Sequence, residues 1–255
     1  MPLFSIITIV YNGEALLPGT VESVLNQGFE SYEHLIIDGA SKDDTLNLIR
    51  EYAQKNPRIK WISEPDKGLY DAMNKGQAMA QGTYLLFLNC GDHLHSPDTL
   101  QKLADSIEPE TDVLYGETLL VDDNRTPAGT MSEWSTRKLP EQLDWKKYLG
   151  GMLVVHQSFL PRRTLVEPYV EQNLCADFDW CIRILKKSRK NTLAPIIISD
   201  YLMGGMSKQR HRQSLIDRFK VMTWHFGWLQ TIWAHLVIVL RSVKHKLIRP
   251  KNKRY

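Results

Sequence analysis

The first ninety residues alternate between short apolar runs and stretches whose apolar residues recur at helical spacing. Residues 3–10 are rich in β-branched side chains and end at the turn sequence Tyr11-Asn12-Gly13, which is typical of a buried strand followed by a loop. Further strands are expected at 32–37, 59–63 and 84–88, with helices in each of the intervals between them. Strands and helices at this spacing form βαβ units, so we predict an α/β fold with a mostly parallel, Rossmann-like sheet and helices on both faces.

The pattern is less regular after about residue 110. Residues 113–121 and 152–159 predict two more strands, separated by a polar loop that contains tryptophan, and residues 178–185 predict a helix. Three cysteines without C-x-x-C spacing argue against a disulfide framework and a structural zinc site, which favours a reducing compartment. No secretory signal is visible in the first residues, so we expect a cytoplasmic protein.

Polar residues follow each strand predicted in the first half. Asn12, Asp38, Asp66 and Asp92 all lie in such positions, and ligands of parallel α/β sheets bind at the carboxyl ends of the strands. The glycine-rich dinucleotide and Walker phosphate motifs and the hydrolase G-x-S-x-G motif do not occur in the sequence. Carboxylates at this edge can accept hydrogen bonds from a base or a sugar, hold a divalent metal or act as a general base.

Seven segments, in order over residues 3–207, resemble the family 2 glycosyltransferases of the GT-A fold. They are 5–12 (SIITIVYN), 23–27 (SVLNQ), 36–45 (IIDGASKDDT), 64–76 (EPDKGLYDAMNKG), 87–92 (FLNCGD), 176–180 (ADFDW) and 204–207 (GGMS). The segment 66–76 is most similar to the subgroup that builds bacterial capsule, exopolysaccharide and O-antigen, including colanic-acid transferases. The resemblance implies a GT-A domain at 1–207, with a nucleotide-binding half at about 1–110 and an acceptor half at about 111–207.

The activity that this resemblance implies is inverting transfer of a sugar from a UDP-, GDP- or dTDP-sugar to a hydroxyl of a polyprenyl-diphosphate-linked saccharide. The positions that match the family's nucleotide-binding residues are Tyr11, Asn12, Asp38, Lys67, Asp71 and Asn74. A carboxylate at Asp38 suits the single imide donor of a nucleotide base. Taken alone, each of these residues is also compatible with a structural role: Asp38 with a turn or helix start, Lys67 with a solvated surface, and the others with a turn or a helix.

The metal motif departs from the family's D-x-D form. Asn89 and Gly91 stand where the family has two aspartates, and Asp92 is the single carboxylate that remains. We expect Mg²⁺ or Mn²⁺ to be held by Asp92 together with water and the donor's phosphate oxygens. The alternative is that Asp92 is a turn residue.

Asp177 matches the acid of the family's E-D motif, although Ala176 replaces the preceding glutamate. The resemblance implies that Asp177 is the base that takes the proton of the acceptor hydroxyl, with Asp179 as second choice. Acids two residues apart do not share a helix face, so at most one should point into the site. Residues that resemble the family's acceptor or diphosphate loops are His156, Gly204, Gly205 and Ser207.

Charge divides the chain into two unlike parts. Residues 208–255 hold twelve Lys and Arg against one acid, which gives them a formal charge of +11. The rest of the chain carries −8, so the net charge of the whole chain is +3. Within this tail, residues 221–240 have no formal charge but contain three tryptophans, at 224, 228 and 233. A basic, Trp-rich helix of this kind is typical of a segment that lies on an anionic membrane. The alternatives are packing on the body, a true span and nucleic-acid binding.

The preferred interpretation is therefore an enzyme that is peripheral on the cytoplasmic face of the inner membrane, close to a lipid-linked acceptor, and that does not bind nucleic acid. The alternative function is a degenerate GT-A binding module, in which Gly91 and Ala176 mark lost activity and the basic tail tethers partners. The sequence leaves the oligomeric state open.

Overall fold

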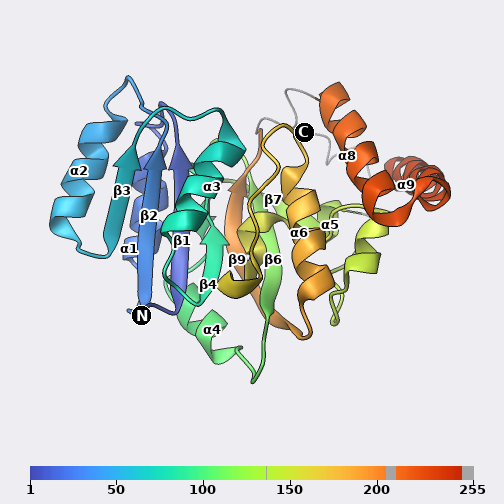
Figure 1. The fold of residues 1–255 in the computed structure, drawn as a ribbon, viewed down its shortest axis with the longest axis horizontal. Helices are drawn as coiled ribbons and strands as arrows, with labels where there is room; N and C mark the ends of the chain where they lie inside the picture. The colour runs from blue at the N-terminus through green and yellow to red at the C-terminus, as the bar shows by residue number, and fades with distance from the viewer. Residues whose placement is uncertain (136, 205–210, 249–255) are drawn as a thin grey trace.

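The computed structural model of the protein describes residues 1–135, 137–204 and 211–248. Its first sheet has four parallel strands in the order β3-β2-β1-β4. These are β1 (Phe4–Val10), β2 (Tyr32–Asp38), β3 (Ile59–Ser63) and β4 (Tyr84–Phe87). The helices that connect and follow them are α1 (Leu17–Leu25), α2 (Thr45–Lys55), α3 (Leu69–Met79) and α4 (Thr99–Asp105). Figure 1 shows this half of the molecule in blue and cyan, with α4 in green.

Helices cover both faces of this sheet, as predicted. All seven residues of β1 are buried, and successive side chains of a strand point to opposite faces. Ile7 therefore packs in one apolar cluster with Met73 of α3, whereas Val10 packs in another with Leu17 and Val21 of α1. The unbroken apolar run of β1 is explained by burial on both sides.

The second sheet has the order β5-β9-β6-β7, and β8 pairs with β6. The strands are β5 (His93–Leu94), β6 (Val113–Val121), β7 (Pro127–Thr130), β8 (Phe159–Pro161) and β9 (Asn191–Leu202). Strands β6 and β9 are parallel, and the other pairs are antiparallel. A β-bridge between Tyr84 of β4 and Arg162 joins the two sheets. The remaining elements of this half are α5 (Met131–Trp134), three 3-10 helices, η1 (Trp145–Gly150), η2 (His156–Ser158) and η3 (Arg163–Leu165), and α6 (Ala176–Lys187).

The predicted strand at 152–159 is wrong in its position, because residues 156–158 form η2 and the strand β8 begins at Phe159. His156, Gln157 and Ser158 are all buried. Their side chains form hydrogen bonds with Asn89, Asp92 and Ser199, respectively. Side chains of a regular strand alternate between two faces, so three successive residues could reach these partners only from the tight turn of η2.

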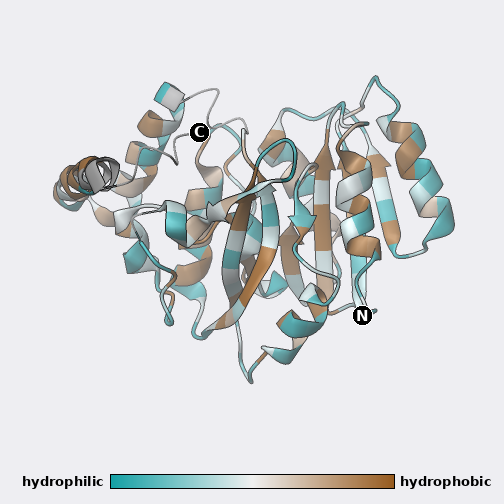
Figure 2. Cartoon of the chain, turned by 180° about the vertical axis from the view of Figure 1, so that it is seen from behind, coloured by the Kyte–Doolittle hydropathy of each residue, from teal (hydrophilic) through white to brown (hydrophobic). Residues whose placement is uncertain are grey.

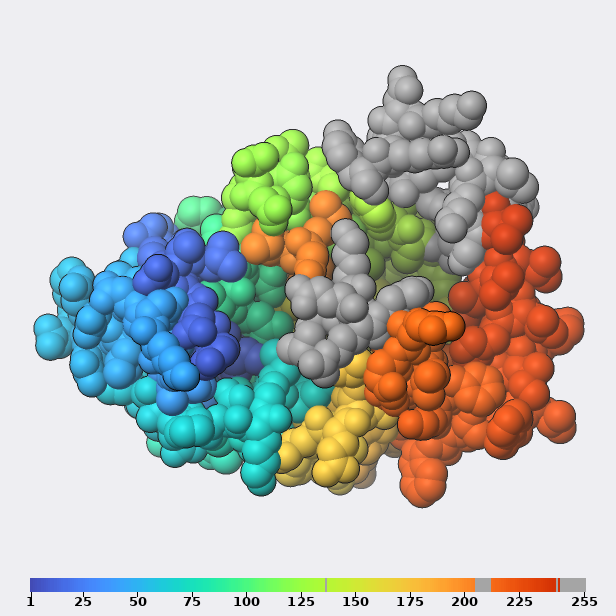
Figure 3. Space-filling view, turned by 90° about the horizontal axis from the view of Figure 1, so that it is seen from above, coloured from blue at the N-terminus to red at the C-terminus, as the bar shows by residue number. Residues whose placement is uncertain are grey.

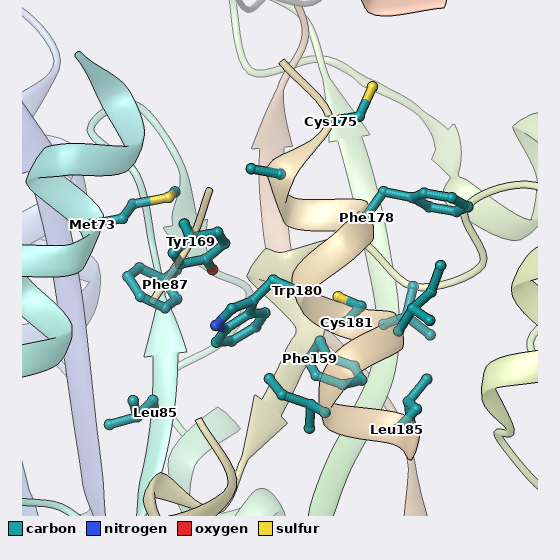
Figure 4. Close-up of a cluster of buried hydrophobic side chains, with 14 of the residues drawn as sticks. Met73, Leu85, Phe87, Phe159, Tyr169, Cys175, Phe178, Trp180, Cys181 and Leu185 are labelled. Atoms are coloured by element: carbon teal, nitrogen blue, oxygen red, sulfur yellow. The ribbon is translucent and has the colours of Figure 1, made fainter. Parts of the chain in front are cut away.

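Trp180 of α6 lies at the centre of the core between the two sheets and is fully buried. Its ring stacks on Tyr169 at a centroid distance of 4.8 Å and meets Phe87 and Phe159 edge-on. Figure 4 shows these rings between α6 and β4. Burial of such large rings fixes α6, which begins with the sequence Ala-Asp-Phe-Asp, against the first sheet.

Residues 211–248 of the basic C-terminal extension are helical, as predicted, but the apolar stretch 221–240 is not one helix. It is divided between α8 (His211–Phe226) and α9 (Trp228–Ile248) at Gly227, whose φ of +85° favours glycine. Helix α8 buries Val221 and Met222 in the core, and Phe226 stacks on Trp145 of η1 at 5.4 Å. Figures 1 and 2 place both helices at the end of the molecule away from β3. No helix in the described part of the chain is long and apolar enough to cross a membrane.

Candidate functional site

The carboxyl ends of β1, β2 and β4 lie at one edge of the first sheet, and Figure 3 looks onto this edge. Blue N-terminal segments, the light-green loop after β6 and the orange end of β9 border a central hollow there. Asp38, the last residue of β2, pairs in register with Val10 of β1 and Ser63 of β3. The polar residues predicted to follow β1, β2 and β4 therefore lie at the same edge of the sheet.

Asp38 is fully buried, and its carboxylate already accepts hydrogen bonds within the protein. The donors are the amide and hydroxyl of Ser41, at 3.2 and 2.5 Å, and the Ser63 hydroxyl at 2.6 Å. The imide of a nucleotide base would have to share these oxygens. In this structure the carboxylate fixes the loop after β2.

Tyr11 and Asn12 begin the loop after β1. Tyr11 is 59% exposed, and its ring borders Gly39, where an added Cβ would lie 3.4 Å from the ring. Asn12 has a φ of +50°, and its side chain accepts a hydrogen bond from the Lys42 amide at 2.9 Å. Asn12 therefore shapes the loop, while Tyr11 offers an aromatic face to a ligand.

Three other predicted nucleotide-binding positions have different surroundings: Lys67 precedes helix α3, and Asp71 and Asn74 lie on it. Lys67 is exposed, and its amide donates to Asp71 Oδ2 at 2.9 Å. This hydrogen bond, followed by the nearby Lys75 ammonium, lowers the pKa of Asp71. The Asn74 amide exchanges two hydrogen bonds with the backbone of Tyr169, at 2.7 and 3.1 Å. Asn74 thus joins α3 to the segment around Tyr169 rather than facing solvent.

The turn at residues 89–92 follows β4. Asp92 is 3% exposed, and its two oxygens accept hydrogen bonds from the Leu202 amide at 2.9 Å and from Gln157 Nε2 at 3.0 Å. Burial raises the pKa of Asp92 to about 6 in spite of these donors. Asp92 thereby ties the turn to the end of β9.

His156 connects this turn to the predicted base. Its Nε2 lies 3.1 Å from Asn89 Nδ2, and its Nδ1 lies 3.5 Å from Asp177 Oδ2. Since the Asn89 amide nitrogen donates, Nε2 accepts, and the proton of the neutral ring lies on Nδ1, on the side of Asp177. His156 is the group that brings the two halves of the site together.

The two acids at the start of α6 have different environments. The Asp177 side chain is 26% exposed, and its Oδ1 accepts from the Phe178 amide at 2.8 Å and lies 3.4 Å from the Tyr70 hydroxyl. Asp179 is 11% exposed and is paired with Arg183 and with His225 of α8. The structure therefore brings Asp177, and not Asp179, to His156.

A divalent ion would find few protein ligands at this edge. The described residues contain no group of three His, Cys, Asp or Glu side chains that could hold a metal. Among them, Asn89 Oδ1 is buried without a hydrogen-bond partner, and it lies in the same turn as the Asp92 carboxylate. These oxygen donors fit Mg²⁺ or Mn²⁺, provided that water and phosphate oxygens fill the other positions.

Two of the predicted loop residues lie outside the described part of the chain, and one residue at this edge, Arg125, was not predicted. Gly204 follows β9 with a φ of +123°, whereas Gly205 and Ser207 lie outside the described residues. Arg125 was not predicted, yet its guanidinium contacts the Gly91 carbonyl and His93. Its position in the turn between β6 and β7 gave no signal, because a lone arginine in a polar loop is ordinarily solvated.

Comparison with known proteins adds the family. The model of the family described as glycosyl transferase family 2 matches residues 5–167. The chain belongs to this family. A PGL/p-HBAD biosynthesis glycosyltransferase of Mycobacterium tuberculosis is 30% identical over 249 residues, which cover 94% of this chain and 90% of the relative. The putative glycosyltransferase EpsH of Bacillus subtilis is 27% identical over 186 residues, or 67% of this chain and 54% of that protein.

Two solved structures are similar in fold. TarS 1–349 of S. aureus in complex with UDP-GlcNAc has a TM-score of 0.70 at 14% identity, covering 97% of this chain and 73% of that one. The mannosyltransferase PcManGT from Pyrobaculum calidifontis, with GDP-Man and Mn²⁺, has a TM-score of 0.67 at 14% identity, covering 99% and 77%. The expected GT-A fold and glycosyltransferase activity are confirmed.

Proposed function

We propose that this glycosyltransferase moves a sugar, with inversion, from a nucleotide-diphosphate sugar to a hydroxyl of a polyprenyl-diphosphate-linked saccharide in bacterial surface polysaccharide synthesis. The observation that carries the proposal is the chain of contacts from Asp177 through His156 to Asn89. It joins a partly exposed carboxylate to the turn where the donor's diphosphate is expected.

In the proposed reaction, Asp177 accepts the proton of the acceptor hydroxyl while that oxygen attacks the anomeric carbon of the donor. The bond between the anomeric carbon and the diphosphate oxygen breaks, and the nucleoside diphosphate leaves from the opposite face. The Phe178 amide, at 2.8 Å, and the Tyr70 hydroxyl, at 3.4 Å, both donate to Asp177 Oδ1 and keep the carboxylate in place, while His156 Nδ1 lies 3.5 Å from Oδ2. A carboxylate held in one orientation reacts without first reorganising.

The donor's nucleoside would lie against the exposed Tyr11 ring, near Asp38, with Lys67 available to the diphosphate. Asp92 and Asn89 would hold Mg²⁺ or Mn²⁺, which supplies positive charge to the leaving diphosphate when it is bound. The solved neighbours bear UDP-GlcNAc in one case and GDP-Man with Mn²⁺ in the other, which supports a nucleotide sugar of this class as donor.

The C-terminal helices would hold the enzyme on the cytoplasmic face of the inner membrane. Large apolar side chains of α9 face solvent at helical spacing: Leu229 is 84% exposed, Trp233 68%, Leu236 54% and Leu240 69%. Basic residues precede and follow this stripe in the sequence. An apolar stripe between cations suits an anionic lipid surface, where a lipid-linked acceptor would be found.

The test compares the wild type with Asp177→Asn, which removes the proton acceptor and keeps the shape of the side chain. Binding of UDP-, GDP- and dTDP-sugars is measured first by thermal shift with Mn²⁺, and the donor that stabilises the fold is then used for transfer. We expect unchanged donor binding and a rate at least about a hundredfold lower in the variant. Normal transfer by Asp177→Asn would refute the assignment of the base. Donor binding without turnover by the wild type would favour the binding module.

A further inference from the structure

Helix α8 holds the segment that leads into α6. Asp217 Oδ2 accepts a hydrogen bond from the Leu174 amide at 3.2 Å, and the Cys175 thiol donates to the Ser214 carbonyl at 3.2 Å. Asp217 and Ser214 are each 4% exposed. Buried polar groups that pair across two elements fix the distance between them, so α8 determines where α6 begins.

A second contact fixes how α6 is turned about its axis. His225 of α8 is 3% exposed, and its Nε2 lies 2.7 Å from Asp179 Oδ1. The Lys186 ammonium lies 3.0 Å from the other ring nitrogen, Nδ1, and can only donate to it. The proton of the neutral ring is therefore on Nε2, and His225 donates to Asp179. Arg183 occupies the second oxygen of Asp179 at 2.8 Å.

Asp177 and Asp179 share the first turn of α6, two residues apart, so they point about 200° away from each other around the helix. Asp179 is held by α8 on one side, and Asp177 faces His156 on the other. A carboxylate about 5–6 Å from the helix axis moves about 2 Å when the helix turns by about 20°. That displacement exceeds the range over which a general base and its proton remain within hydrogen-bond reach.

We propose that α8 is part of the catalytic unit, and that His225 is a positioning residue that sets the orientation of Asp177 through Asp179. The inference rests on the proposed role of Asp177 as the base. It gives the C-terminal extension a task in addition to membrane binding, because the contacts of Asp217 and His225 lie on α8, whereas the exposed apolar stripe lies on α9.

The test uses the full chain with three substitutions. His225→Ala removes the donor to Asp179, and His225→Gln restores it, because the glutamine amide nitrogen can take the place of Nε2. His235→Ala is the matched control: its Nδ1 lies 2.8 Å from the carbonyl of Thr231 in its own helix, and no contact joins it to α6 within the described residues. Donor Kd, the rate of nucleoside diphosphate release with donor and a polyprenyl-diphosphate-linked sugar, and hydrogen exchange of the peptide at 174–180 are measured for each.

For His225→Ala we expect an unchanged donor Kd, a kcat lower by about ten- to a hundredfold and faster exchange at 174–180. His225→Gln should recover most of both losses, and His235→Ala should match the wild type. A His225→Ala variant that keeps the wild-type kcat overturns the inference, even if its Tm falls, because α8 would then only stabilise the fold. If Asp177→Asn is fully active, the base assignment fails first; if it is inactive while His225→Ala is normal, only the positioning role fails.

Discussion

His34 makes the stability of this fold dependent on pH in a way that can be worked out from its contacts. It lies in β2, four residues before Asp38, and is fully buried. The Thr8 hydroxyl donates to the Leu88 carbonyl at 2.8 Å, so Thr8 Oγ1 must accept the hydrogen bond from His34 Nε2 at 2.9 Å. Nδ1 then carries the lone pair, and it is buried without a partner among the described residues.

Protonation would add an N–H at Nδ1 with no acceptor in a dry interior, and burial accordingly lowers the pKa of His34 from 6.5 to about 3. Between these values the unfolded chain binds the proton and the folded chain does not. The free energy of unfolding is therefore unaffected by His34 above about pH 6.5, and it decreases as the pH falls from there towards about 3. At about pH 5 the loss is about 2 kcal/mol, and above about pH 7 it is close to zero.

The assay is urea unfolding of the wild type and of His34→Gln at about pH 7.5 and about pH 5. Glutamine keeps a donor for Thr8 but does not titrate, so its packing defect is common to both conditions. The free energy of unfolding of the wild type should fall by about 2 kcal/mol more than that of the variant. Equal decreases in the two proteins, or a pKa of His34 above about 5 by NMR, would show that this ring is not held neutral by burial.

Two further predictions concern ligands. Removal of Mn²⁺ with EDTA should weaken donor binding, measured by calorimetry, by about tenfold or more in the wild type, because one carboxylate supplies the protein's charge to the ion. Donor binding by Asp92→Asn should be unaffected by EDTA. An equal metal dependence in both proteins would exclude Asp92 as a ligand. The double substitution Trp233→Gln and Leu236→Gln should reduce partition onto phosphatidylglycerol vesicles by at least about tenfold, because each change removes apolar surface worth about 1.5–3 kcal/mol when buried. Unchanged sedimentation of the variant with such vesicles would contradict docking through α9.

The first sheet could be predicted from sequence because its signals are local. Each strand is a short, mostly apolar run closed by turn residues, as in residues 3–13, which is typical of strands in a parallel sheet buried on both faces. The helical period also predicted that Asp177 and Asp179 would face different ways, and they do. The helical period cannot predict which of these two aspartates points into the site. That depends on His156 and His225, which come from distant parts of the chain.

The errors have the same origin. Residues 152–159 have the composition of a strand, but the hydrogen bonds of Gln157 with Asp92 and of His156 with Asn89 join segments more than sixty residues apart. Pairings of that kind have no counterpart in a local pattern. Likewise, the uncharged stretch 221–240 gave no indication that its first part would bury Met222 in the core while its second part leaves Trp233 exposed.

The place of β9 in the second sheet determines when the enzyme becomes complete as it is synthesised. All strands of the first sheet have been made by residue 87, so this half can form while the rest of the chain is still emerging. Strand β9 ends at Leu202 and lies between β5 and β6, both of which are made about seventy or more residues earlier. The turn that holds Asp92 is tied to the Leu202 amide, and α6 is held by α8. The proposed catalytic arrangement therefore forms only after β9 and α8 have left the ribosome.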